Sequence, residues 1–245
     1  MNYYQLGLLD YTKSSWVLND VVKKLPKHQH PDMAPVFYKF FSSPDAQVQL
    51  KQQYHSVICR KCGRFEMDDA FKIGFFKPVI LRFKEDIGQT DDNVTVINDK
   101  CRNALESAKV GGYETKPIGE TGWHAFRVTL LLPPPKESIT TRGKKCTACG
   151  RPEYMGVQSW RVSHVTQPTD RNTFYSTNVR YTGSSVSDRD IFLTEDVVST
   201  LKAAKVKGPH CSRLQTDEEV EKRLQLEKEG KRWMPKGLTV YLNGK

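Results

Sequence analysis

The sequence predicts an α+β protein made of two related halves, each holding a small, mostly antiparallel sheet and a helix. Three observations predict this fold class. A CxxCG motif occurs twice, once in "ICRKCGR" at residues 58–64 and once in "KCTACGR" at residues 145–151. A segment with the pattern of a strand followed by a helix also occurs twice, at residues 94–118 and 190–214. Elsewhere, short runs rich in aromatic and β-branched residues favour strands.

The two strand–helix segments align at a constant offset of 96 residues. They are "VTVINDKCRNALESAKVGGYETKPI" and "DIFLTEDVVSTLKAAKVKGPHCSRL", and five of the fifteen positions from Asn98 to Gly112 are identical. In each segment an apolar stretch leads to a residue that can cap a helix, Asn98 or Thr194, and apolar residues then recur at helical spacing. We expect Gly112 and Gly208 to end these helices in the left-handed conformation.

Other parts of the chain predict further strands and one more helix. Residues 216–230 begin with a capping residue and an acidic first turn and end at a glycine, which predicts a mostly solvated helix. The run "PPP" predicts that residues 130–145 form an extended connector between an N-terminal half at residues 1–132 and a C-terminal half at residues 133–245. Strands are predicted in "MNYYQLGLL", "VFYKFF", "YHSVI", "GWHAFRVTLLL", "GVQSWRVSHV", "TFYSTNVRY" and "GLTVYLNGK".

The two cysteine pairs are offset by 87 residues, nine fewer than the strand–helix segments. The second half therefore contains nine additional residues between its cysteine pair and its helix. We expect them within the polar, turn-rich stretch from residue 167 to residue 190.

The cysteine pairs predict one structural zinc site that is shared by the two halves. A CxxC turn presents two sulfurs on one face, a tetrahedral zinc ion needs four ligands, and four protein ligands leave no open catalytic position. A glycine follows each pair and suits a sharp turn, whereas a redox CxxC usually opens a helix. A dithiol or disulfide role stays open as the alternative. The predicted zinc ligands are Cys59, Cys62, Cys146 and Cys149.

No feature of the sequence points to an enzyme. The chain has no GxSxG, HExxH, Walker A or dinucleotide-binding glycine pattern, and its six histidines have no spacing typical of catalysis. We interpret His28 and His30 as loop residues. Cys101 lies on the predicted buried stripe of its helix and is interpreted as a core residue, and Cys211 as a passive residue although His210 precedes it.

The formal net charge of +10 would attract an acidic partner, whether nucleic acid, an acidic protein surface or an anionic membrane face. The N-terminus lacks the pattern of a secretory signal, and no apolar run is long enough to span a bilayer. We therefore expect a cytoplasmic protein without membrane insertion. Thiols stay reduced in that compartment, which favours metal binding over disulfides for the CxxC pairs.

Taken together, these features resemble the double-CXXCG motif protein family of bacteria. The matching stretches are "MNYYQLGL", "ICRKCGR", "ALESAKVGGYETKPI", "KKCTACGR" and "DRDIFLTEDVVSTLKAAKVKG". The family includes immunity proteins that are encoded beside polymorphic toxins used in contact-dependent competition between bacteria. The resemblance therefore implies a cytoplasmic protein that binds and neutralises a cognate protein toxin. It carries over the four zinc cysteines but no toxin-contacting residue, and the charged tail beyond residue 215 departs from the family outline.

The charge supports a different function as the alternative. A zinc-ribbon nucleic-acid-binding protein would account for the CxxC pairs, for the net charge and for aromatic residues near basic ones, such as Trp160 beside Arg161. Its affinity for DNA or RNA would fall steeply with salt.

Overall fold

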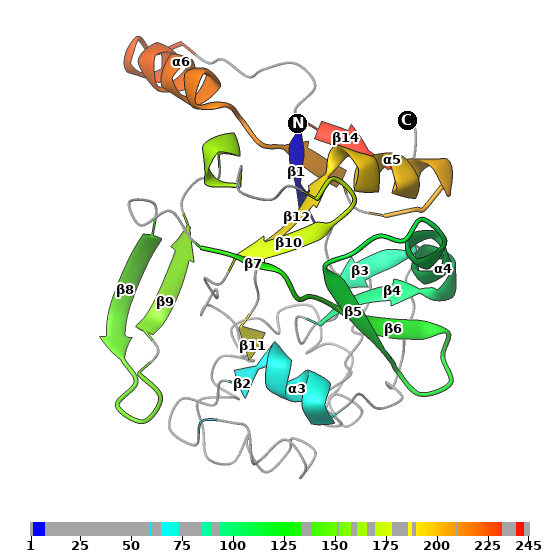
Figure 1. Ribbon diagram of the computed structural model, residues 1–245. Coiled ribbons are helices and arrows are strands. Elements are labelled where there is room, and N and C mark those ends of the chain that lie inside the picture. Colours follow the sequence, from blue (N-terminus) through cyan, green and yellow to red (C-terminus); the bar gives the residue numbers. More distant parts are fainter. Residues whose placement is uncertain are drawn as a thin grey trace, which may run out of the picture.

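The computed structural model confirms an α+β fold with two antiparallel-rich sheets and a few helices (Figure 1). All structural statements below concern the residues that it describes, which are 2–7, 59, 65–73, 85–89, 94–133, 139–150, 152–157, 161–165, 170–177, 186–187, 190–208, 210–231 and 239–242. The strands predicted in "VFYKFF" and "YHSVI" lie outside these residues.

The first sheet has four antiparallel strands in the order β3-β4-β6-β5. The strands are β3 (Ile87–Gln89), β4 (Thr95–Asn98), β5 (Tyr113–Pro117) and β6 (Trp123–Val128). Helix α4 (Asp99–Ser107) follows β4 directly, as the sequence predicts.

The second sheet has six strands in the order β14-β13-β1-β12-β10-β7. They are β1 (Tyr3–Gly7), β7 (Leu131–Leu132), β10 (Phe174–Thr177), β12 (Ile191–Thr194), β13 (His210–Arg213) and β14 (Thr239–Tyr241). All neighbours are antiparallel except β7 and β10, which are parallel. Helix α5 (Glu195–Ala203) follows β12.

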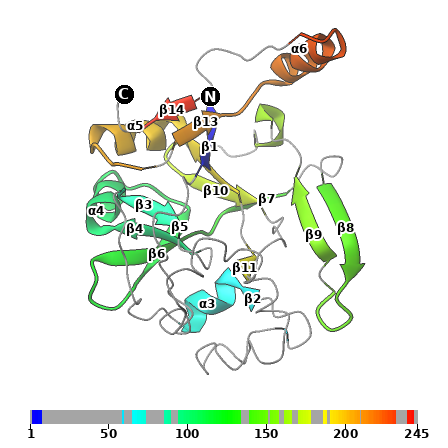
Figure 2. The same ribbon diagram turned by 180° about the vertical axis from the view of Figure 1, so that it is seen from behind.

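Smaller elements lie around the two sheets. A two-stranded hairpin consists of β8 (Ile139–Lys145) and β9 (Pro152–Val157), and a parallel pair consists of β2 (Phe65–Glu66) and β11 (Val186–Ser187). Two short helices are α3 (Met67–Ile73) and the 3-10 helix at Val162–His164, and the longest helix among the described residues is α6 (Asp217–Lys228). Both views place α6 and the β8–β9 hairpin at the periphery (Figures 1 and 2).

The two sheets contain the same four-stranded arrangement in the same register. The order β3-β4-β6-β5 corresponds to β10-β12-β1-β13. In the first sheet His124 on β6 faces Ile97 on β4 and Pro117 on β5. In the second, Tyr4 on β1 faces Leu193 and Arg213, which follow Ile97 and Pro117 by 96 residues each. The two halves are therefore related in backbone pairing as well as in sequence.

The strand that completes the second arrangement comes from the opposite end of the chain. β1 lies between β12 and β13, where β6 lies between β4 and β5 in the first sheet. The chain that follows β13 forms α6 instead of a corresponding strand. The division of the chain at residue 132 stays a prediction. The second sheet contains strands from both sides of this boundary, because β1 and β7 precede residue 133 and both belong to it.

The nine additional residues of the second half lie between β10 and β12. Gln89 on β3 corresponds to Ser176 on β10 with an offset of 87, whereas Thr95 on β4 corresponds to Ile191 on β12 with an offset of 96. The offset changes within this interval, which falls inside the stretch expected from the sequence. The interval also contains β11.

Both strand–helix segments begin their helices at the predicted residues, but only α4 has the predicted capping bond. Asn98 caps α4, because its side-chain oxygen accepts a hydrogen bond of 3.0 Å from the N–H of Cys101. Thr194 is the cap residue of α5, yet its side chain makes no capping bond. Its hydroxyl donates instead to the carbonyl of Arg171. In α5, a hydrogen bond to Arg171, which is distant in sequence, therefore takes the place of the capping bond within the helix.

The prediction that Gly112 and Gly208 end the two helices in the left-handed conformation is wrong. The residue in the left-handed conformation is Lys109 just after α4, with φ 52°, and Lys205 just after α5, with φ 50°. Gly112 also has positive φ, 77°, but it lies three residues beyond Lys109 and packs against the backbone of Phe174. Gly208 is not in the left-handed region.

Both helices end in a Schellman motif, which explains why lysine is tolerated in that conformation. The N–H of Val110 bonds to the carbonyl of Leu105 at 3.0 Å, and the N–H of Val206 bonds to the carbonyl of Leu201 at 3.0 Å. The side chains of these four residues are all buried in the main core, which suits the apolar positions of this motif.

The main core includes side chains of both halves, with Leu105 of α4 and Leu201 of α5 both fully buried. Cys101 and Cys211 belong to it as well, and both are 0% exposed. This confirms Cys101 as a core residue and places Cys211 in the same core.

Helix α6 and the last strand confirm the sequence prediction, while two other segments correct it. Thr216 and Glu219 form a capping box at the start of α6, and Val220 is the one residue of this helix that is buried. "GVQSWRVSHV" is not one strand, because β9 ends at Val157 and Val162–His164 is a 3-10 helix. Residues 130–145, predicted to be an extended connector, contain strands β7 and β8. Strand β8 pairs with β9 on the other side of the second cysteine turn.

Within the described residues, no helix combines the length and the apolar character needed to cross a bilayer.

Candidate metal centre

The second cysteine pair lies in the turn of the β8–β9 hairpin. Cys146 follows β8 directly, and a hydrogen bond of 2.7 Å from the N–H of Gly150 to the carbonyl of Cys146 closes the turn around Cys149. Gly150 has φ 72°, the conformation that glycine adopts most readily. The predicted reason for the glycine after this cysteine pair is therefore confirmed.

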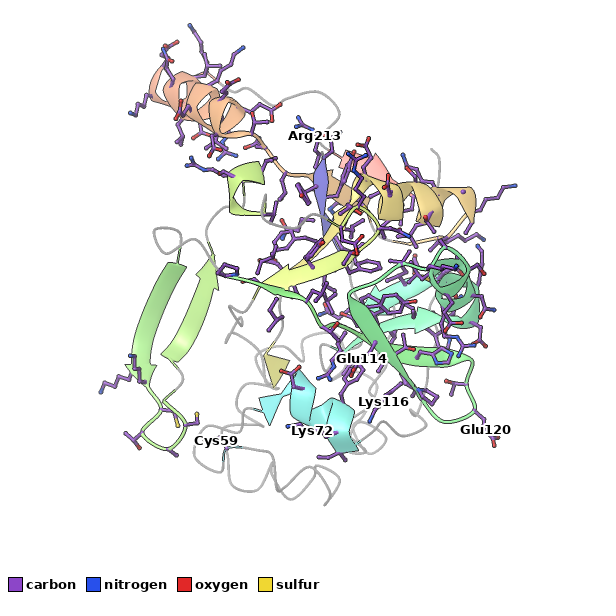
Figure 3. The ribbon with its side chains drawn as sticks, viewed as in Figure 1. Cys59, Lys72, Glu114, Lys116, Glu120 and Arg213 are labelled. Carbon is purple, nitrogen blue, oxygen red and sulfur yellow. The ribbon has the colours of Figure 1, made fainter. Side chains whose placement is uncertain are left out.

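The first cysteine pair is represented by Cys59, which lies beside the turn of this hairpin (Figure 3). The sulfur atoms of Cys59, Cys146 and Cys149 all lie within 4.8 Å of one another, and all three residues are half-buried. The structure thus brings together ligands that are 87 residues apart in the chain. Cys62 lies outside the described residues, so its place in the cluster stays a prediction.

The spacing of the sulfurs fits a tetrahedral metal site. The Sγ atoms of Cys59 and Cys146 are 3.8 Å apart. Four thiolates at the usual zinc–sulfur distance of about 2.3 Å would be about 3.8 Å from one another at the corners of a tetrahedron. A disulfide needs about 2.05 Å, and the cysteines that the structure describes are free thiols. The cluster could therefore hold a metal ion.

The backbone of the turn favours the thiolate, which is the form that binds metal. The pKa of Cys146 is lowered to about 6, mainly because its sulfur accepts a hydrogen bond from the N–H of Cys149. Burial acts in the opposite direction, and the N–H of Ala148 and the thiols of Cys149 and Cys59 lower the pKa further. The lysines at 144 and 145, which precede Cys146 directly in the chain, are exposed.

The remaining cysteines have the opposite character. Burial raises the pKa of Cys101 and that of Cys211 to about 12, so both stay protonated. Neither belongs to the metal cluster, as the sequence analysis expected. In the described part of the chain, the three cysteines form the only cluster of three or more potential ligands among cysteine, histidine, aspartate and glutamate side chains.

Two histidines, His124 and His210, lie on strands of the two sheets. His124 is buried on β6, and its Nε2 lies 2.8 Å from Oδ1 of Asp99 at the start of α4. This contact ties the helix to the sheet. His210 is half-buried on β13. His28, His30 and His55 lie outside the described residues.

The sequence analysis missed the element that follows the first cysteine pair. Helix α3 is held against the first sheet by Arg127 of β6, which forms ion pairs with Asp68 at 2.8 Å and with Glu114. The guanidinium also lies 4.7 Å from the centre of the Phe71 ring. Seven residues are too short for a clear helical period, although the carboxylate of Asp68 in the first turn was a usable signal.

The described surface does not carry the net positive charge of the chain. Acidic and basic side chains are nearly balanced among the described residues, so the excess of lysine and arginine lies in the rest of the sequence. Several basic residues are also neutralised locally, among them Arg127, Arg213 at 2.6 Å from Glu219, and Lys100 at 2.8 Å from Asp86.

No protein-family model matches the chain, and no curated protein matches it.

Proposed function

We propose that this protein acts by binding another protein, and that a structural zinc ion held by Cys59, Cys62, Cys146 and Cys149 joins its two halves. The observation that carries the proposal is the convergence of three thiols from both cysteine pairs, with 3.8 Å between Cys59 and Cys146. With Cys62 as fourth ligand the coordination sphere is closed, so the ion stabilises the fold and performs no catalysis.

The partner that we propose is a cognate bacterial toxin, which the protein neutralises in the cytoplasm. This part rests on the resemblance to the double-CXXCG family. A four-cysteine metal site without an open position would be compatible with a role that needs only a rigid surface. A specific complex of this kind would bury about 1,200 to 2,000 Å² in total.

The zinc part is tested by elemental analysis of the purified full chain. We expect one zinc per chain, and loss of this zinc in Cys146→Ser/Cys149→Ser. The matched control is Cys101→Ser/Cys211→Ser, which removes two core thiols and should keep the zinc in whatever fraction folds. A chain without zinc, or with two ions, would show that the two halves do not share an ion.

The toxin part is tested separately, with the protein encoded by the neighbouring gene as the probe. We expect a one-to-one complex and survival of cells that produce both proteins. A zinc-loaded, folded chain that neither binds nor protects would overturn the toxin proposal and leave the zinc proposal intact.

A zinc-ribbon nucleic-acid binder is the second candidate, supported by the exposed lysines 144 and 145 beside the cysteine turn. Fluorescence anisotropy with labelled DNA and RNA at low salt would test it. Binding should weaken steeply with salt and should be reduced in Lys144→Glu/Lys145→Glu. Absence of binding at low salt would rule this candidate out.

A further inference from the structure

The N-terminal strand β1 makes its bonds to a part of the chain that is far from it in sequence. Its backbone pairs with β12 on one side and with β13 on the other. Two side-chain bonds go to the same half: Gln5 of β1 donates to Asp190 at 2.8 Å, and Asn2, directly before β1, donates to Glu195 at 3.1 Å. β1 therefore fills a slot in the second half.

The second sheet needs a strand in this slot, the position between β12 and β13, to remain folded. On β1, Tyr3, Tyr4 and Leu6 are 3%, 7% and 8% exposed. Without β1, the backbone edges of β12 and β13 would be unpaired, and the fully buried Leu193 and Cys211 would lose their cover. A slot with this much unpaired backbone and apolar surface will accept any strand with the same sequence and register.

The corresponding strand of the first half is connected quite differently. β6 follows its neighbour β5 after the short turn at residues 118–122 and can pair with β5 only within the same chain. Between β1 and Cys59, in contrast, lie residues 8–58. A strand on such a long connection can reach a slot in its own chain or in another chain while making identical bonds.

We propose that β1 is exchangeable, so that a second copy of this chain can supply it and two chains form a reciprocal, twofold dimer. Each chain then places its β1 between β12 and β13 of the other. Because the bonds in the slot are the same in both arrangements, the protein concentration at which the chain folds decides between monomer and dimer.

A native cysteine allows a direct test in the full-length chain. Leu6 lies directly opposite Cys211 in the β1–β13 pair, and residues so placed have Cα separations suited to a disulfide. The Leu6→Cys chain is refolded under reducing conditions with zinc, at low micromolar and at near-millimolar concentration. Both samples are diluted to the same concentration and oxidised, then examined on a non-reducing gel and by peptide mass spectrometry.

We expect a link between residues 6 and 211 within one chain after refolding at low concentration, and between two chains in a share that rises with the refolding concentration. The matched control is Thr115→Cys/Phe126→Cys, the corresponding pair of the first half, which should stay within one chain at every concentration. Exclusively intrachain links, or dimers that lack the link between residues 6 and 211, would overturn the proposal.

If Leu6→Cys does not fold, the unaltered chain provides the second measurement. Sedimentation velocity after refolding at both concentrations should show a dimer that forms only at high concentration and persists on dilution, because exchange requires opening of the sheet. A monomer under all conditions would overturn the proposal.

Discussion

The units β4–α4 and β12–α5 end their helices alike but begin them differently. Both end in a Schellman motif with a lysine in the left-handed position. At the start, Asn98 bonds to its own helix, whereas Thr194 bonds to the carbonyl of Arg171. The comparison teaches that backbone hydrogen bonds local to each helix determine how it ends. The side-chain bond of the cap residue at the helix start depends instead on which neighbouring groups lie within reach in each half.

The two halves also bind each other through non-equivalent groups. The N–H of Asp86 donates to the carbonyl of Lys207 at 2.6 Å, and its carboxylate accepts bonds from Lys100 and from the N–H of Lys207. At the corresponding contact, Gly111 and Asn172 bond through their backbones at 2.9 Å. One contact between the halves thus depends on a charge, and the other does not.

The largest expected effect tests whether the two helices contribute equally. Leu105→Ala and Leu201→Ala each remove a fully buried side chain at the same position of a Schellman motif. We expect each to lower the free energy of unfolding by about 3 to 4 kcal/mol, within about 1 kcal/mol of the other. Urea denaturation measures both. A much smaller loss for one variant would show that its half is packed more loosely.

A second pair of variants should separate the halves. A Cβ at Gly112 would collide with the carbonyl oxygen of Phe174 and lie 2.7 Å from Cγ2 of Thr173, at a positive φ. A Cβ at Gly208 would be 3.5 Å from Ile87, an ordinary contact. We therefore expect Gly112→Ala to cost about 3 kcal/mol and Gly208→Ala less than about 1 kcal/mol. Equal losses in thermal denaturation would contradict the comparison.

The charged contact between the halves predicts a dependence on pH. Burial by itself raises the pKa of Asp86, but the bonds from Lys100, the N–H of Lys207 and Asn98 outweigh it, so the folded-state pKa lies below the unfolded one. The stability that Asp86 contributes is complete above the unfolded pKa and is lost as the pH falls through the folded pKa. Asp86→Asn should cost about 2 kcal/mol at neutral pH and progressively less in acid.

Urea denaturation of Asp86→Asn and the unaltered chain over a pH series measures this difference. Thr173→Val at the other contact serves as the control, because it removes no charge. A difference that stays constant with pH would mean that Asp86 is not ionised in the fold.

The smallest effect should be a gain. Lys109 and Lys205 hold a left-handed conformation that costs a lysine more than a glycine. Lys109→Gly and Lys205→Gly should each raise the free energy of unfolding by about 0.5 to 1 kcal/mol. A loss of stability in either variant, seen as a lower thermal midpoint, would mean that the lysine side chain makes a contact worth more than this conformational cost.

Part of the candidate site could be predicted because cysteine spacing is a local signal. The two CxxCG motifs identify Cys59, Cys146 and Cys149, and the structure brings these three together. The elements that follow the first CxxCG motif, β2 and α3, could not be predicted in the same way. Helix α3 is held by Arg127 of the distant strand β6, and its one local signal is the carboxylate of Asp68 in the first turn. The β2–β11 pair joins segments more than a hundred residues apart and leaves no local pattern.

By itself, the sequence determined the fold class, the repeated strand–helix units, the capping of Asn98 and Thr216, and the cysteine pairs. Each depends on side chains a few residues apart, whose propensities and bonds act within one turn or one strand. Only the tertiary structure decided that β1 completes the second half, that Thr194 bonds away from its helix, and that β8 pairs across the cysteine turn. Those outcomes depend on which distant backbone groups come into reach, and no short segment of the sequence specifies that.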